Sequence, residues 1–174
     1  MITNVTLSTK EEMLLQDQKS HEEQCILKYE NYANLAQDEE LKNIFRELGQ
    51  KEVEHLNTIN QLLSGSVPSM GGNSQQQSSQ SQQSSQPQQM QQTGQAQQGS
   101  INQSMPSTVK LTDKDMCMDM LSTEKFVSGA YDTAIFECKD TAVRQVLNHI
   151  QKEEQEHGES IFKYMQSRGM YTVK

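Results

Sequence analysis

Apolar residues recur at steps of three and four along two long stretches of the chain, residues 9–65 and 112–169. This spacing predicts amphipathic helices, and neither stretch shows the strict alternation that is typical of strands. Thr9 with Glu12 forms a capping box at the start of the first helix, and Asp38 is a good N-cap for the second. We therefore predict four helices, at about residues 9–36, 38–64, 112–138 and 140–168.

The second and fourth predicted helices interrupt their apolar stripe with a glutamate and, three residues later, a histidine. The stripe of the second helix is Leu41, Phe45, Leu48, Glu52, His55, Ile59 and Leu62. The stripe of the fourth is Val143, Leu147, Ile150, Glu154, His157, Ile161 and Tyr164. Because an unpaired buried carboxylate is costly, a single interruption would favour a stripe that drifts to the edge of the bundle. The same interruption in two helices favours a buried polar site.

The second block of the sequence repeats the first at a shift of 102 residues, without a gap between residues 22 and 63. The matched pairs include Glu22 with Glu124, Tyr29 with Tyr131, Asp38 with Asp140, Glu52 with Glu154, His55 with His157 and Ile59 with Ile161. Each repeat is thus expected to be a helical hairpin, with one glutamate on its first helix and a Glu-x-x-His motif on its second.

Two such hairpins, paired around a pseudo-twofold axis, would bring four carboxylates and two imidazoles into one core. Ferritin-like four-helix bundles hold di-iron or di-manganese centres with such a set. A glutamate and a histidine three residues apart share one helix face, so both can reach one metal. The predicted ligands of two Fe or Mn ions are Glu22, Glu52, His55, Glu124, Glu154 and His157. Two cations roughly 3–4 Å apart need bridging carboxylates, and we assign that role to Glu52 and Glu154.

Tyr29 and Tyr131 each follow the first-helix glutamate by seven residues and share its face. Two roles are open for them: core packing with a hydrogen bond from the hydroxyl, or support of the metal ligands. Cys25 lies one turn after Glu22 and is expected inside as a small apolar residue, with a redox role as the alternative.

The segment between the two blocks has an unusual composition. Residues 56–109 hold no Asp, Glu, Lys or Arg, and 14 of the 24 residues in 75–98 are glutamine. Such a segment buries too little apolar surface to offset its chain entropy. We predict a flexible linker at 66–109 between hairpins at 1–65 and 110–174, and its length suits a crossover along the bundle. Self-association or crosslinking of the glutamines is the alternative.

Charge and cysteine usage exclude several classes of protein. The net charge is -8, and neither block offers the basic surface that nucleic acid requires. No apolar run approaches 18 residues, and the start of the chain resembles no signal peptide, so we expect no membrane insertion. Three cysteines without a C-x-x-C pair indicate reduced thiols and an intracellular protein.

Two family resemblances follow from these residues. Glu22, Tyr29, Tyr32-Ala33 and the run 52–55 (Glu-Val-Glu-His) resemble the rubrerythrin branch of the ferritin-like superfamily. The second block resembles the coat F domain of endospore-forming bacteria. The residues that carry this second resemblance are 111–115 (Leu-Thr-Asp-Lys-Asp), 121–125 (Leu-Ser-Thr-Glu-Lys), 144–147 (Arg-Gln-Val-Leu) and 169–171 (Gly-Met-Tyr). The ferritin-like resemblance covers both blocks, about 120 residues, and the coat F resemblance covers about 60 residues.

The two resemblances imply different functions. The coat F resemblance implies a protein of the spore coat that is made during sporulation and associates with other coat proteins or with itself. The rubrerythrin resemblance implies reduction of peroxide or dioxygen at a dinuclear metal centre. Rubrerythrins usually add a rubredoxin module with paired C-x-x-C motifs, which this sequence lacks, so electrons would come from a separate donor. Val127 stands where their third helix often carries an extra carboxylate.

Overall fold

The computed structural model describes residues 3–68 and 110–172, which contain four long helices and two very short strands. The helices are α1 (Thr9–Leu35), α2 (Glu39–Leu63), α3 (Asp113–Glu137) and α4 (Thr141–Ser167). The strands β1 (Thr3–Asn4) and β2 (Ser66–Val67) pair antiparallel. All four predicted helices are confirmed, with bounds within a residue or two of those expected.

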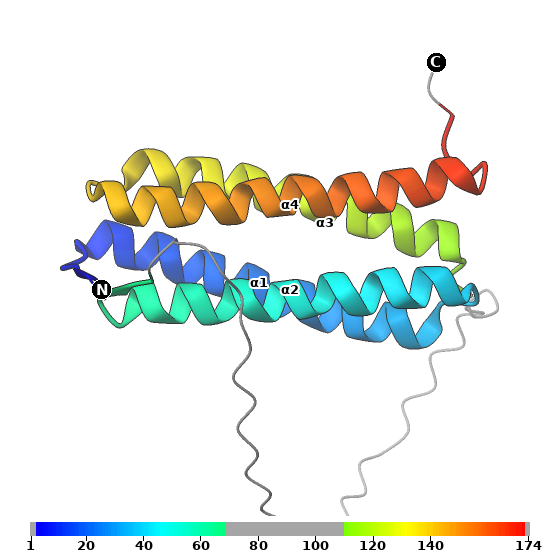
Figure 1. Cartoon of the computed structure of the whole chain (residues 1–174), viewed down its shortest axis with the longest axis horizontal. Helices are drawn as coiled ribbons and strands as arrows, with labels where there is room; N and C mark the ends of the chain where they lie inside the picture. The colour runs from blue at the N-terminus through cyan, green and yellow to red at the C-terminus, as the bar shows by residue number, and fades with distance from the viewer. Residues whose placement is uncertain (1–2, 69–109, 173–174) are drawn as a thin grey trace, which may run out of the picture. The chain divides into compact units, whose positions relative to one another are not determined.

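The four helices form one compact unit in which each hairpin lies against the other (Figure 1). α1 packs against α2 and α3, and α4 packs against α3 and α2. Asp113, at the start of α3, accepts hydrogen bonds from the backbone N–H groups of Gln37 and Asp38, at 2.8 and 3.0 Å. The end of α2 lies instead beside the start of the chain, where β2 pairs with β1. α2 therefore ends, and α3 begins, at opposite ends of the bundle.

The boundary after the first hairpin differs slightly from the predicted one. Ser66 and Val67, the first residues of the predicted linker, pair with the start of the chain, and Val67 is buried. The ordered hairpin thus extends two residues beyond the predicted boundary at Gly65. Residues 69–109 of the predicted linker lie outside the described residues.

The start of α1 corrects one prediction. The N-cap is Ser8, whose hydroxyl accepts from the Glu11 N–H, and the Glu11 carboxylate accepts from the Ser8 N–H at 2.7 Å. The capping box predicted for Thr9 with Glu12 is wrong by one residue. Both registers satisfy the local motif, but Glu11 is buried and also accepts from the Lys139 N–H at 2.8 Å. This contact with the α3–α4 turn selects the Ser8 register.

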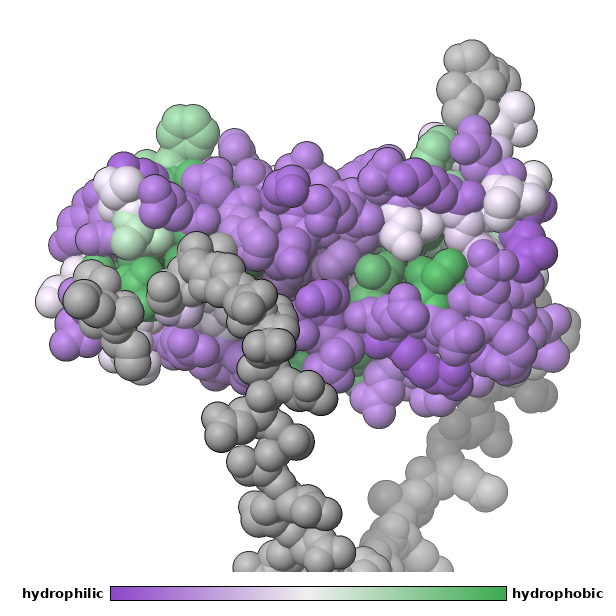
Figure 2. All heavy atoms as spheres, in the orientation of Figure 1, coloured by the Kyte–Doolittle hydropathy of each residue, from purple (hydrophilic) through white to green (hydrophobic). Residues whose placement is uncertain are grey.

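The core runs along the inside of the bundle, between the two hairpins. Every residue of the two predicted stripes is buried except Leu48, which is half-buried. Figure 2 shows a mostly polar outer face, with small apolar areas along the seam between α2 and α4. No helix among the described residues is both long and apolar enough to cross a bilayer. The mid-length of this core is where the glutamates and histidines lie.

Candidate metal centre

The structure brings the six residues predicted as ligands into one buried cluster. α1 and α3 each contribute one glutamate, and α2 and α4 each contribute a glutamate and a histidine. The exposed fractions lie between 0% and 4% for Glu22, Glu52, His55, Glu124, Glu154 and His157. Four carboxyl groups inside an apolar core are exceptional, because charged residues are almost never fully buried unless they are paired.

The six residues fall into two overlapping groups, each of which could hold a metal ion. One group is Glu22, Glu52, His55 and Glu154, and the other is Glu52, Glu124, Glu154 and His157. Within each group, one ligand atom from every residue lies within 4.8 Å of the others. Glu52 and Glu154 belong to both groups, as a pair of bridging carboxylates would.

Both histidines direct the same ring nitrogen, Nδ1, toward the carboxylates. His55 Nδ1 lies 2.9 Å from Glu154 Oε1, and His157 Nδ1 lies 2.8 Å from Glu52 Oε1. Each histidine thus approaches the glutamate of the opposite hairpin more closely than that of its own helix, where the distances are 3.4 and 4.0 Å. The two rings stack with their centroids 5.5 Å apart. The reciprocal pattern matches the repeat in the sequence.

Two buried tyrosines hold the remaining glutamates from across the bundle. The Tyr29 hydroxyl donates to Glu124 Oε1, and the Tyr131 hydroxyl donates to Glu22 Oε1. Burial, followed by the negative charge of the accepting glutamate, raises the pKa of both phenols well above the ordinary value, so both remain donors. The two roles left open for these tyrosines coincide: they pack in the core and they orient candidate ligands.

Most ligand atoms of the cluster have no hydrogen-bond partner. Among the described residues, nine buried side-chain N and O atoms have no hydrogen-bond partner, and eight of them belong to this cluster. The eight are Glu22 Oε2, both Glu52 oxygens, His55 Nδ1, Glu124 Oε2, both Glu154 oxygens and His157 Nδ1. The short imidazole–carboxylate distances are therefore not aligned as hydrogen bonds. Each such atom costs about 1–3 kcal/mol, so the cluster suits cations that would coordinate all eight atoms.

Burial and mutual contacts shift the pKa values of the cluster strongly. Burial and the charge of Glu52 raise the pKa of Glu22 to about 7, against the opposing contact with His55. Burial also raises the pKa of Glu154 well above its ordinary value. For Glu52, burial is outweighed by His157 and His55, and the pKa falls. For His157, burial is outweighed by Glu124 and Glu52, and the pKa rises to about 9. In the metal-free protein the raised pKa values of Glu22, Glu154 and His157 thus favour their protonated forms, whereas Glu52 stays ionised.

Glu153 is a neighbour of the cluster that the sequence reasoning missed. Its Oε2 lies 3.0 Å from Nε2 of His55, the ring nitrogen that faces away from the other carboxylates. The equivalent residue in the first repeat is Lys51, which pairs with Glu54 at 2.8 Å instead. Only the packing of α4 against α2 reveals the contact, because Glu153 lies off the apolar stripe. The two histidines are therefore supported differently.

Other residues weighed in the sequence fall where expected. Cys25 is fully buried, and burial followed by the nearby Glu52 raises the pKa of its thiol far above the ordinary value. This keeps the thiol protonated, which suits an apolar core residue better than a redox partner. Val127 is buried and apolar.

Comparisons with known proteins give one family and one relative. Residues 112–174 match the family described as the Coat F domain. Over 70 residues the chain is 30% identical to "Uncharacterized protein YusN" of Bacillus subtilis, which covers 40% of this chain and 64% of YusN. The chain thus spans slightly less than two thirds of that relative. No solved structure matches the chain significantly.

These matches support one of the two predicted resemblances and leave the other untested. The resemblance of the second block to the coat F domain is confirmed, and the match spans α3 and α4. The resemblance to rubrerythrins stays a prediction, as does the ferritin-like assignment of the fold. The Coat F domain match covers residues 112–174, which include Glu124, Glu154 and His157.

Proposed function

We propose that the protein is a spore coat-associated, ferritin-like four-helix bundle whose core holds two Fe or Mn ions. The match of residues 112–174 to the Coat F domain supports the association with the spore coat. The observation that carries the metal centre is the set of eight unpartnered buried atoms on the six Glu and His residues. Leaving them unsatisfied in an apolar core is costly, and bound cations would satisfy them.

In this proposal each residue of the cluster has a distinct task. Glu52 and Glu154 would hold both ions, because each belongs to both groups of candidate ligands. Glu22 and Glu124 are terminal ligands through their free Oε2 atoms, while Tyr131 and Tyr29 hold the other oxygens in place. His55 and His157 supply one nitrogen each through Nδ1. When bound, two such ions would supply redox or Lewis-acid chemistry in a water-poor core.

Metal analysis tests the proposed centre. Protein purified from cells grown with iron and manganese should carry up to two metal ions per chain, and metal-free protein should gain thermal stability when Mn²⁺ or Fe²⁺ is added. The matched control is the double variant Glu54→Gln and Glu156→Gln, which changes exposed glutamates on the same two helices. Replacing Glu52 and Glu154 by Gln should abolish the metal content. A wild-type protein that is consistently metal-free and gains no stability would overturn the proposal.

The second candidate function is a rubrerythrin-like oxidoreductase that reduces peroxide or dioxygen with an external electron donor. The complete ligand set and the two tyrosines bonded to it favour this reading. Mixing the reduced iron-loaded protein with peroxide in a stopped-flow instrument separates the two functions. An oxidoreductase should be oxidised much faster than free ferrous ion. Oxidation no faster than that of free ferrous ion would leave a structural metal centre in a coat protein.

A further inference from the structure

The two hairpins differ in how far they cover the buried carboxylates from outside. A groove of about 320 Å³ lies between α3 and α4, and two of the candidate ligands, Glu124 and Glu154, line it. Its other lining residues are Leu121, Lys125, Ser128, Gln155 and Gly158. Both oxygens of Glu154 and one of Glu124 are buried without a hydrogen-bond partner. The groove therefore lies beside two residues whose unpartnered ligand atoms are buried.

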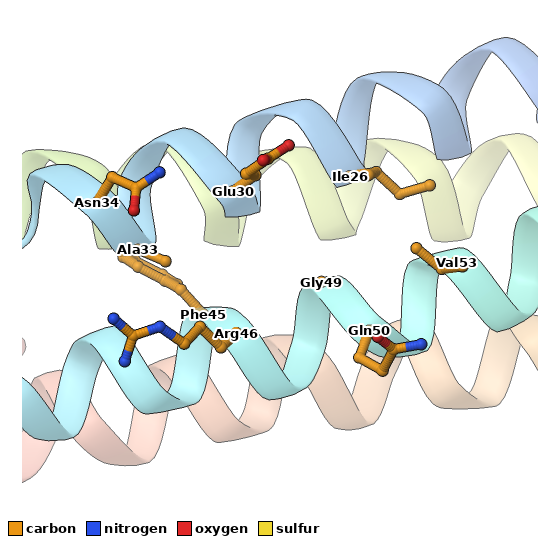
Figure 3. A pocket seen from close by; sticks show the side chains of 9 residues that line it. All are labelled: Ile26, Glu30, Ala33, Asn34, Phe45, Arg46, Gly49, Gln50 and Val53. Atoms are coloured by element: carbon orange, nitrogen blue, oxygen red, sulfur yellow. The ribbon is translucent and has the colours of Figure 1, made fainter. Parts of the chain in front are cut away.

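The corresponding place on the first hairpin carries bulky apolar side chains. At the repeat shift, Ser128, Gln155 and Gly158 correspond to Ile26, Val53 and Leu56. A groove also lies between α1 and α2, but none of the six candidate ligands lines it. Figure 3 shows this groove with Ile26 of α1 and Val53 of α2 at the same end. The groove on the second hairpin is thus lined by two candidate ligands, whereas the groove described on the first hairpin is lined by none.

Gly158 is the position where this difference is largest. A Cβ added there would lie 3.6 Å from Leu121 Cδ1 and 3.8 Å from Glu124 Cβ, which are ordinary contact distances. Close helix packing therefore does not require the glycine, although glycine costs about 1 kcal/mol relative to alanine inside a helix. A longer side chain at this position would extend into the groove; the equivalent residue of the other hairpin is Leu56, which is half-buried.

We propose that the groove between α3 and α4 is the route by which divalent cations reach the core, and that the α1–α2 face is closed to them. The inference rests on the proposed metal centre. The carboxyl groups of Glu124 and Glu154 line the groove and offer a cation ligand atoms, whereas the positive charge of Lys125 at the exposed rim opposes its approach. The small side chains at Ser128 and Gly158 leave space for an ion with part of its water shell.

The rate of Co²⁺ uptake by the metal-free full-length protein tests this route, because Co²⁺ changes its visible absorption when protein ligands replace water. Gly158→Leu should load Co²⁺ severalfold more slowly than the wild type, with the same final stoichiometry. Ser128→Ile narrows the groove from the other helix and should also slow uptake. Gly129→Leu is the matched control, since nothing lies within 4 Å of a Cβ at that exposed position of α3. Circular dichroism verifies that each variant is folded.

Charge at the rim gives a second readout. Lys125→Gln should speed Co²⁺ uptake about threefold at low ionic strength and much less at high salt, because a single repulsive charge is screened. If wild type binds Co²⁺ and both groove-filling variants load at its rate, the route is wrong while the metal centre stands. If wild type binds no Co²⁺, the proposed centre itself fails.

Discussion

At the scale of single residues, the two histidines of the cluster are not equivalent. The outer nitrogen of His55 contacts Glu153 at 3.0 Å, whereas the residue at the same place in the other repeat is Lys51. A carboxylate on the outer nitrogen fixes the ring and raises the basicity of the metal-binding nitrogen. The metal position served by His55 should therefore bind more tightly than the one served by His157.

Replacing Glu153 by Ala tests this difference. We expect affinity at the stronger of the two metal positions to fall about tenfold or more, with the weaker position nearly unchanged. Calorimetric titration with Mn²⁺ would resolve the two positions. Glu156→Ala is the matched control, because Glu156 is exposed on the same helix and pairs only with Lys152 among the described residues. Equal weakening of both positions would indicate a general structural effect and contradict the assignment.

At the scale of the helices, close packing requires a glycine inside α2 but not inside α3. A Cβ at Gly49 would lie 3.0 Å from the Cβ of Tyr29, which cannot move without shifting α1. Tyr29 also donates to Glu124 of α3, so a shift of α1 here would disturb a contact of the cluster. At Gly129, nothing lies within 4 Å of an added Cβ.

The two glycines should respond oppositely to alanine. Gly129→Ala should stabilise the protein by up to about 1 kcal/mol, since alanine favours a helix and meets no neighbour. Gly49→Ala gains the same helix propensity but should lose more, because overpacking costs about 1–3 kcal/mol. Urea unfolding followed by circular dichroism measures both. A stabilised Gly49→Ala variant would show that α1 and α2 can separate at no cost.

At the scale of the whole molecule, the fold brings together ionisable groups whose pKa values shift in opposite directions. Glu22 and His157 have raised pKa values, and a raised pKa stabilises the fold below the unfolded value and loses that stability as pH rises through the folded value. For Glu22 the loss runs from 4.5 to about 7, and for His157 from 6.5 to about 9. Glu52, whose pKa is lowered, contributes stability above 4.5 that is lost as pH falls further.

The metal-free protein should therefore become less stable as pH rises from about 5 to 9. Metal binding must displace the protons of Glu22, Glu154 and the imidazoles, so the gain in melting temperature on adding Co²⁺ should grow over the same interval. Thermal melts with EDTA and with Co²⁺ across this range measure both trends. A metal-free protein that grows more stable with rising pH would contradict the protonation of the cluster.

The sequence alone was sufficient for the helices and for the membership of the cluster. The apolar spacing places α1 to α4, because helix periodicity and caps are local properties. The duplicated Glu and Glu-x-x-His pattern identifies the six residues that the structure brings together, since a repeat implies that equivalent residues meet near one axis. Whether they bind metal is a matter of chemistry that the proposed experiments test.

The tertiary structure decided what depends on neighbours from other helices. It selected Ser8 over Thr9 as the cap of α1, because Glu11 bonds to the α3–α4 turn. It joined Tyr29 and Tyr131 to the glutamates of the opposite hairpin and placed Glu153 on His55. It also placed a groove beside Glu124 and Glu154 on the second hairpin. Periodicity tells which face of a helix is buried, but partners across an interface follow from how the helices pack, and that depends on the whole chain at once.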